Sequence, residues 1–354
     1  MSPSLPQTPV FLLTGFLGAG KTTLLNRLLE DPALADTALV INEFGLVAVD
    51  HDLVRKGSER ASVTTTGCIC CSAGSDLRSS LDELLALRRK GGLPPFSRVI
   101  VETTGLADPA PIVNSLIPGG IPARSLSDHA VARAFRLSGV IAVVDAEGIE
   151  AALAAHPESL RQIAFADQAV VTRARGQDWT ARLRALNPGI AVHDAGDPGF
   201  DPAALLAPGS YSAFGKGEGV EAWLETETAR GPGAHGGHMH DLNRHGAVQA
   251  VPLVAEAPLD PDALQGFLAG LAAAPESGLL RIKGLAALAD DPARPAVIHA
   301  VQHRLYPLLR LEGWPPGQAA SRIVVIGTRL DERGLRRRFA ALGAAAASRA
   351  PFLA

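Results

Sequence analysis

The chain has 354 residues, a length that suggests about two domains. Its formal net charge is −3, from 33 Lys and Arg against 36 Asp and Glu, which argues against nucleic acid or an anionic membrane as a partner. Hydrophobic residues at 47% and charged residues at 19% exclude a disordered chain, and three cysteines are too few for a disulfide scaffold.

The cysteines are clustered between positions 68 and 71. This clustering favours a reducing compartment and a metal or redox role over a structural disulfide. No apolar run approaches the roughly 20 residues needed to span a bilayer, and the apolar run 10–13 lacks the basic flank of a signal peptide. We therefore expect a cytoplasmic protein without a membrane segment.

Short apolar runs alternate with helical periodicity through the first two-thirds of the chain. The predicted elements are strands at 10–14, 38–42, 98–101, 139–145 and 168–172, and helices at 22–30, 77–90 and 179–186. This alternation predicts an α/β domain with a mostly parallel sheet covered on both faces. A ligand site in such a domain lies beyond the carboxyl ends of the strands.

A Gly- and His-rich stretch interrupts this pattern and predicts a flexible linker between two domains. The expected boundaries are a nucleotide domain at 1–215, the linker at 216–246, a small α+β domain at 247–342 and a tail at 343–354. Within the second domain we predict strands at 247–254, 278–283, 295–301 and 323–328, and helices at 261–273 and from 336 onward. His299 and His303 are expected on one face, as hydrogen-bonded or surface residues.

The segment from Gly15 to Thr22 matches G-x-x-x-x-G-K-[ST] after a predicted strand and before a predicted helix. Glycines let backbone N–H groups curl around phosphate oxygens, and the following helix adds its positive end. Lys21 would reach the β- and γ-phosphates, and the Thr22 hydroxyl would hold Mg²⁺. A ligand-free Gly-rich turn is a poor alternative, because a full match rarely arises by chance. The predicted nucleotide-binding residues here are Gly15, Gly18, Ala19, Gly20, Lys21, Thr22 and Thr23.

A second candidate is the strand that ends at Glu102. P-loop proteins place a carboxylate that acts on Mg²⁺ or water at such a position. Gly105, three residues further on, would present its N–H to the γ-phosphate and so sense hydrolysis. The pattern alone also fits a buried strand with a capping Glu. Behind a phosphate loop it predicts Lys21, Glu102 and Gly105 as the catalytic residues.

Cys68, Cys70 and Cys71 form a C-x-C-C motif in a predicted loop. Thiolates are soft ligands for Zn²⁺, Co²⁺ or Cu(I), and three of them leave a tetrahedral ion one open position. That open position suits a site that passes metal on. A redox pair fits less well, since the spacing is not C-x-x-C, and burial as three small apolar residues is the remaining alternative.

Together these motifs resemble the CobW-type metallochaperone GTPases, relatives of the nickel-insertion GTPases of hydrogenase and urease maturation. The matching segments are 15–23, 42–45, 67–71 and 102–109, and the likeness extends through the second domain, in 280–284, 299–303 and Trp314-Pro315. The resemblance implies GTP hydrolysis with Mg²⁺, coupled to delivery of Zn²⁺ or Co²⁺. The recipient would be a client metalloprotein or an enzyme of metal-cofactor biosynthesis, and a homo-oligomer stays open.

The sequence departs from this family at two places. Thr172 and Arg173 fall where the family has N-K or T-K and are predicted nucleotide contacts, but Arg175 stands where an Asp accepts the guanine N–H groups. A cation cannot accept hydrogen bonds, and Asp178 is three residues late, so weak GTP binding, acceptance of ATP and loss of turnover all stay open. Leu46 stands where many members carry a carboxylate, which leaves Glu43 as the candidate metal ligand.

Histidines in the linker are further, weaker candidates for metal. Neutral imidazoles at His235, His238 and His240 could collect Zn²⁺ or Co²⁺ for the thiols, or they could simply be solvated. Two other functions remain open for the whole chain. One is a metal-binding regulatory module with degenerate or non-guanine nucleotide binding, and the other is a small-molecule P-loop kinase.

Overall fold

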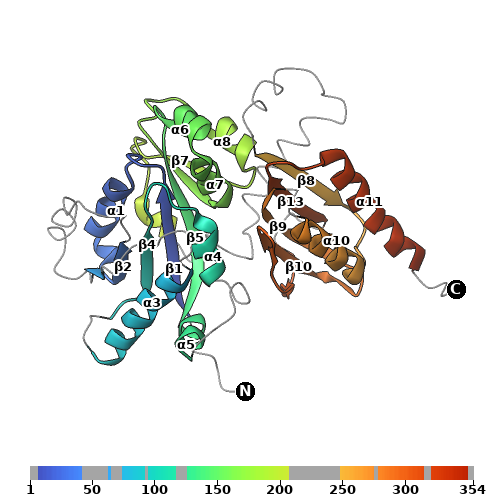
Figure 1. The fold of residues 1–354 in the computed structure, drawn as a ribbon, viewed down its shortest axis with the longest axis horizontal. Coiled ribbons are helices and arrows are strands. Elements are labelled where there is room, and N and C mark those ends of the chain that lie inside the picture. The colour runs from blue at the N-terminus through green and yellow to red at the C-terminus, as the bar shows by residue number, and fades with distance from the viewer. Residues whose placement is uncertain are drawn as a thin grey trace. The chain divides into compact units, whose positions relative to one another are not determined.

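The computed structural model describes residues 7–41, 63–64, 74–91, 95–116, 126–206, 248–274, 278–314 and 320–349. The chain divides into two compact units, the first built mainly on residues 1–211 and the second mainly on residues 212–354 (Figure 1). Among the helices in these ranges, none combines the length and apolar character that crossing a bilayer requires.

A parallel sheet forms the centre of the first unit. Its strands are β1 (Thr8–Gly15), β2 (Thr37–Ile41), β3 (Val63–Thr64), β4 (Arg98–Glu102), β5 (Phe135–Asp145), β6 (Gln168–Thr172) and β7 (Ala191–Asp194). The strand order is β3-β2-β4-β1-β5-β6-β7, and every pairing among the described strands is parallel. The carboxyl end of β1 therefore lies between those of β4 and β5, where such sheets place their ligands.

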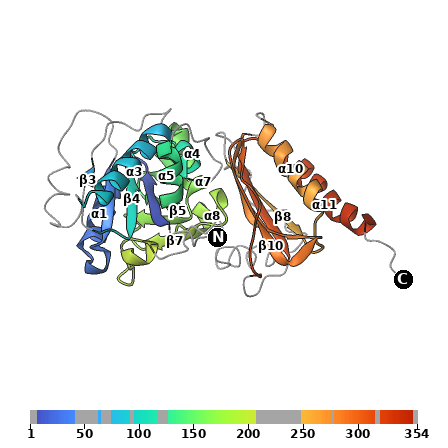
Figure 2. The ribbon, with the colours of Figure 1, turned by 90° about the horizontal axis from the view of Figure 1, so that it is seen from below.

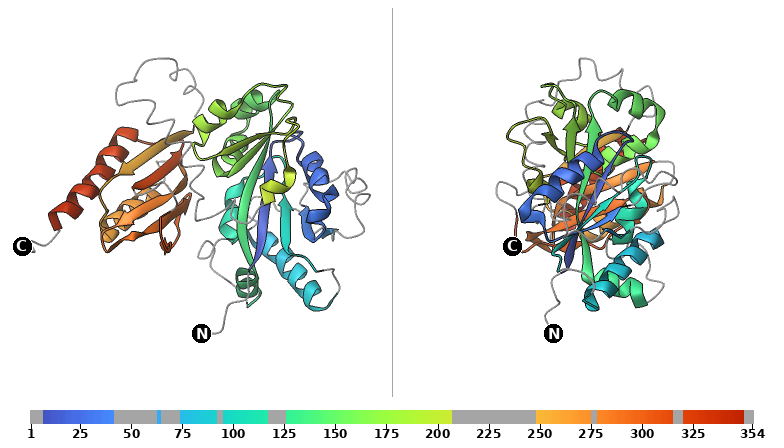
Figure 3. Two further views of the ribbon diagram at one scale, coloured as in Figure 1. Left: turned by 180° about the vertical axis from the view of Figure 1, so that it is seen from behind. Right: turned by 90° about the vertical axis from the view of Figure 1, so that its left-hand side faces the viewer.

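Helices cover both faces of this sheet. They are α1 (Lys21–Glu30), α3 (Gly74–Arg89), α4 (Pro109–Leu116), α5 (Leu126–Ala134), α6 (Ile149–Ala155) and α7 (Pro157–Phe165), with short 3-10 turns at Pro32–Leu34 and Pro202–Leu206. Helix α8 (Thr180–Leu186) follows β6 in the chain, and most of it groups with the second unit. Phe11 and Leu13 of β1 pack with leucines of α1 in one core cluster. Alternate residues of a strand face opposite sides, so Val10 and Leu12, also buried, face the side where α4 and α7 pack (Figure 3).

The second unit is an antiparallel sheet with helices on one face. Its elements are β8 (Gln249–Ala255), α10 (Pro261–Ala273), β9 (Leu279–Leu288), β10 (Asp291–Val301), β11 (Arg304–Leu305), β12 (Leu309–Arg310), β13 (Ser321–Gly327) and α11 (Glu332–Arg349). The strand order is β11-β10-β9-β13-β8, with β12 also paired to β10. Both α10 and α11 lie along the same face (Figure 2), where Leu268 and Phe339 pack onto Ile282 and Ile323.

The predicted fold class is confirmed: a mostly parallel α/β domain with a P-loop, and a small α+β domain. β6 and α10 have the bounds that the sequence predicts. Several other bounds were wrong by a few residues, since β5 begins at Phe135, β9 continues to Leu288 and α11 begins at Glu332. Helices α4 to α7 and strand β7 were not predicted.

His299 and His303 do not share a face, contrary to expectation. β10 ends at Val301, and Gln302 adopts a left-handed conformation with φ of +52° in the turn to β11. The alternation of the strand therefore does not extend to position 303. His299 is buried against the Tyr306 ring, whereas His303 is exposed.

Candidate functional site

The loop between β1 and α1 depends on glycines for two different reasons. Gly18 and Gly20 have left-handed backbone conformations, with φ of +75° and +97°, which glycine adopts without steric cost. At Gly15, a Cβ atom would lie 2.2 Å from the Val143 carbonyl oxygen of β5. Gly20 also caps the N-terminus of α1. The loop thus places backbone N–H groups and a helix N-terminus at one spot, an arrangement that attracts phosphate.

Lys21 folds back over this loop. Its side chain is buried, and Nζ donates hydrogen bonds to the carbonyl oxygens of Gly15 at 2.9 Å and Phe16 at 3.1 Å. These bonds hold the ammonium group at the mouth of the loop. The loop therefore combines a fixed positive charge with its backbone donors.

The Thr22 hydroxyl and the Glu102 carboxylate lie side by side. Thr22 Oγ1 donates to Glu102 Oε1 at 3.1 Å, and Glu102 is only 7% exposed at the end of β4. The parallel register of β1 with β4, which places Leu13 opposite Glu102, brings the carboxylate to the start of α1. Hydroxyl and carboxylate oxygens are the hard donors that Mg²⁺ prefers, so these two residues fit a Mg²⁺ site.

The Gly105 loop, residues 103–107, packs directly against the phosphate loop. A Cβ atom on Gly105 would lie 2.5 Å from the Leu17 nitrogen, so a larger residue does not fit without a shift. The Thr103 N–H donates to the Leu13 carbonyl oxygen at 2.9 Å. The predicted sensing glycine is therefore adjacent to the phosphate loop itself.

Gln162 of α7 anchors the Gly105 loop and was not predicted from the sequence. It is 1% exposed, and Nε2 donates to the carbonyl oxygens of Gly105 and Ala107, each at 3.1 Å. Such buried amides are costly unless they are hydrogen-bonded. The one sequence signal was its place directly before the apolar run 163–166. Glutamine is an unusual residue at a position that faces a core.

Two residues at the end of β6 bind the phosphate loop from the other side. Thr172 Oγ1 donates to the Ala19 carbonyl oxygen at 2.8 Å, and Arg173 Nη2 donates to the Gly18 carbonyl oxygen at 2.9 Å. The Arg173 guanidinium also hydrogen-bonds Asp145 at 2.7 Å, which holds the pKa of that carboxyl below its usual value. Both predicted contacts thus fix the main chain of the phosphate loop.

Arg175 projects into solvent, two residues beyond Arg173 and its contacts with the phosphate loop. Its side chain is 80% exposed, its backbone is left-handed with φ of +51°, and it forms an ion pair with Glu147. Asp178 accepts a hydrogen bond from the Thr180 N–H at 2.8 Å at the start of α8. Asp178 therefore serves as a local cap in this structure, and a cation occupies the position of the expected base reader.

The structure brings Lys21, Thr22, Glu102, Gly105, Thr172 and Arg173 together around the phosphate loop, and leaves Thr23 on the exposed side of α1. The other candidates, Glu43, Cys68, Cys70, Cys71, His235, His238 and His240, lie outside the described residues. In the part of the chain that is described, no three His, Cys, Asp or Glu side chains gather as metal ligands would. The metal site stays a prediction.

A parallel sheet with this loop after its central strand, a buried lysine in the loop and a carboxylate on the neighbouring strand define a P-loop nucleotide-binding protein. Comparison with protein families agrees. Residues 9–190 match the CobW/HypB/UreG nucleotide-binding domain, and residues 248–343 match the cobalamin synthesis protein cobW C-terminal domain. The chain belongs to the CobW/HypB/UreG family.

Two curated relatives match nearly the full chain. The zinc chaperone YjiA of Escherichia coli (strain K12) is 28% identical over 337 residues, covering 94% of this chain and 98% of the relative. The zinc chaperone CobW of Sinorhizobium sp is 28% identical over 355 residues, covering 94% and 97%. Among solved structures, the Zn(II)-bound YjiA GTPase from E. coli superimposes with a TM-score of 0.70 at 23% identity, covering 96% of this chain and 99% of that one. That likeness shows the fold.

Proposed function

We propose that this protein hydrolyses GTP and couples hydrolysis to the binding and delivery of a divalent transition metal. The observation that carries the proposal is the juxtaposition, around the phosphate loop, of the Lys21 ammonium, the Thr22–Glu102 pair and the Gly105 loop. The first two are the parts that bind phosphate and Mg²⁺ in P-loop hydrolases, and the third lies where a γ-phosphate would be sensed. The names of the curated relatives, zinc chaperones, support zinc as the cargo.

Each part of the site has a separate role in hydrolysis. Lys21 and the loop N–H groups bind the phosphates, and Thr22 with Glu102 would hold Mg²⁺. When bound, Mg²⁺ neutralises the negative charge that develops on the phosphates. The Gly105 N–H reports whether the γ-phosphate is present, and Gln162 holds the loop that carries it.

The proposed cargo site consists of Cys68, Cys70 and Cys71, with Glu43 as an additional ligand. Chain length supports its link to the nucleotide, because Glu43 is two residues beyond Ile41, a reach of at most about 7 Å. Ile41 pairs with Glu102 in the sheet. Loss of the γ-phosphate would therefore change the surroundings of the metal ligands. The ion would then pass to a client metalloprotein or a metal-cofactor enzyme. The linker histidines would collect metal weakly, and the cytoplasm is the proposed compartment.

The direct test compares hydrolysis of GTP by wild type, Lys21→Ala and a control, Lys90→Ala, which removes an exposed lysine after α3. We expect Lys21→Ala to reduce kcat/KM by about 100-fold or more, since it removes a preorganised charge from the transition state. Lys90→Ala should match wild type. Absence of nucleotide-dependent activity in wild type, or equal activity in the two variants, would contradict the proposal.

Arg175 favours a second candidate, a metal-binding regulatory module with degenerate or non-guanine nucleotide binding. The exposed cation offers guanine no acceptor for its N–H groups. Parallel measurements with ATP separate the two candidates. Equal and slow turnover of both nucleotides, together with intact metal binding, would support the regulatory module.

A further inference from the structure

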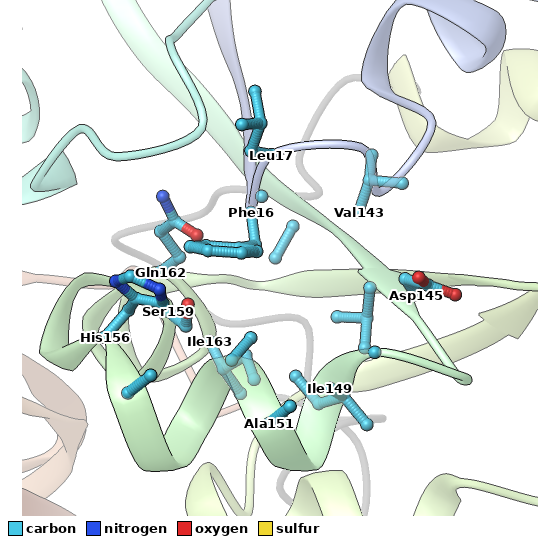
Figure 4. A pocket seen from close by; sticks show the side chains of 16 residues that line it. Phe16, Leu17, Val143, Asp145, Ile149, Ala151, His156, Ser159, Gln162 and Ile163 are labelled. Carbon is cyan, nitrogen blue, oxygen red and sulfur yellow. The ribbon is translucent and has the colours of Figure 1, made fainter.

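A cavity of about 280 Å³ lies between the phosphate loop, β5 and the helices α6 and α7 (Figure 4). We call it the α7 cavity. Its walls are mainly apolar and include Phe16, Val143, Ile149, Ala152 and Ile163. Its size falls just below the range of typical small-molecule pockets, about 300–1,000 Å³. The cavity adjoins the phosphate loop through Phe16 and Leu17, but Thr172 and Arg173, which support that loop from the end of β6, are not among its lining residues.

A buried hydroxyl faces this cavity. Ser159 of α7 is 2% exposed, and its Oγ has no hydrogen-bond partner within the described part of the chain. Buried polar atoms are almost always hydrogen-bonded in folded proteins, so an unpaired one requires an explanation. The Ser159 side chain lies beside His156 and Gln162 at the cavity wall in Figure 4. A ligand atom that pairs with Oγ would satisfy it.

The lining also restricts the charge of a ligand. Asp145 is the one carboxylate among the lining residues, and Arg173 already pairs with it. The His156 ring packs against the Phe16 ring at a tilt of 33° with centroids 4.6 Å apart, which adds an aromatic surface. The lining contains no Lys or Arg to pair with an anionic ligand, whereas an uncharged ring would find apolar and aromatic walls.

We propose that the α7 cavity binds a small uncharged organic molecule, with an apolar ring and one hydroxyl or carbonyl group that pairs with Ser159. Such a ligand would contact Phe16 and Leu17 of the phosphate loop. It would also contact Gln162, which holds the Gly105 loop. Binding would therefore alter nucleotide hydrolysis, a consequence that rests on the proposed function, whereas the binding itself does not.

Phenol and toluene are matched probes of this site, because they share a ring and differ in the hydroxyl group. Each is titrated against the full-length protein without nucleotide, by protein-observed NMR or calorimetry. Ser159→Ala should weaken phenol about three- to tenfold and leave toluene unchanged, as expected for loss of one neutral hydrogen bond.

Two alanines of α6 supply a steric test. Ala155 lines the cavity and Ala154 does not, and both are exposed, so a tryptophan at either position is compatible with folding. Ala155→Trp should abolish binding of both probes, and Ala154→Trp should retain it. The proposal is overturned if neither probe binds wild type, if the two tryptophan variants behave alike, or if Ser159→Ala affects both probes equally. These results do not depend on whether the protein hydrolyses GTP.

Discussion

Arg175 is the residue at which this chain departs most clearly from the chemistry of guanine recognition. Its neighbours Thr172 and Arg173 hold the phosphate loop through hydrogen bonds to Ala19 and Gly18. Arg175 itself points to solvent and pairs with Glu147. The part of the loop that supports the phosphates is therefore intact, while the part that would read the base is changed.

Arg175→Asp should increase the preference for GTP over ATP by about tenfold or more, because a carboxylate can accept the guanine N–H groups that are otherwise unpaired. The matched control is Arg175→Ala, which removes the same cation and its ion pair without adding an acceptor. The measurement is the ratio of kcat/KM values for the two nucleotides. If both variants shift the ratio equally, the carboxylate at this position does not read the base.

At the scale of elements, α7 connects the core of the first unit to the Gly105 loop. Gln162 bonds two carbonyl oxygens of that loop, and Arg161 pairs with Asp108 at 3.0 Å just beyond it. At its other end the loop is held by Thr103, which hydrogen-bonds Leu13 and Thr14 of β1. α7 thus positions the proposed sensor of the γ-phosphate.

Gln162→Leu keeps the volume of the side chain but removes both donated hydrogen bonds. We expect kcat for GTP hydrolysis to fall about tenfold while KM changes much less, because the phosphate loop and Lys21 are untouched. Steady-state kinetics separate the two parameters, and nucleotide affinity measured by calorimetry provides a control. A rise in KM with unchanged kcat would show that α7 serves binding instead of positioning.

The alternation of strands and helices was readable from the sequence because β1, β5 and β6 are long or strongly apolar. Helices α6 and α7 were not, because α6 buries only Ile149 and Ala152, and the buried face of α7 includes the polar Ser159 and Gln162, so neither helix shows a clear apolar stripe. For the candidate site, the sequence reveals only residues that belong to local motifs. Lys21, Thr22 and Glu102 belong to local motifs, whereas Gln162 acts on carbonyl groups 57 and 55 residues away, which no local pattern specifies.

At the scale of the whole molecule, the second unit carries a titratable group in its sheet. His299 is buried, packs against the Tyr306 ring with ring centroids 5.0 Å apart, and lies opposite Lys283 in the register of β9 and β10. Burial, followed by the positive charges of Arg281 and Lys283, holds the pKa of His299 well below 6.5. The folded unit therefore keeps this imidazole neutral.

Because the folded unit keeps His299 neutral, we expect the second unit to lose stability as the pH falls below about 6.5. The unfolded chain then binds a proton that the folded unit excludes, so the free energy of unfolding falls by up to about 1.4 kcal/mol per pH unit until the folded pKa is reached. Above pH 6.5 the effect is absent. Hydrogen exchange of β10 amides between pH 5 and 8 measures it. His299→Gln should flatten the dependence and the exposed His303→Gln should not; the reverse pattern would assign the effect elsewhere.

The proposed function of the whole molecule depends on coupling between nucleotide binding and metal binding. The most direct measurement is a titration of Zn²⁺ or Co²⁺ into the full-length protein bound to GDP or to a non-hydrolysable GTP analogue. Coupling between two sites typically amounts to 1–3 kcal/mol, so we expect the metal Kd to differ about 5- to 150-fold between the two nucleotides. Cys70→Ala and Cys71→Ala should weaken metal binding and abolish the difference. Equal metal affinity with both nucleotides would contradict the proposed function.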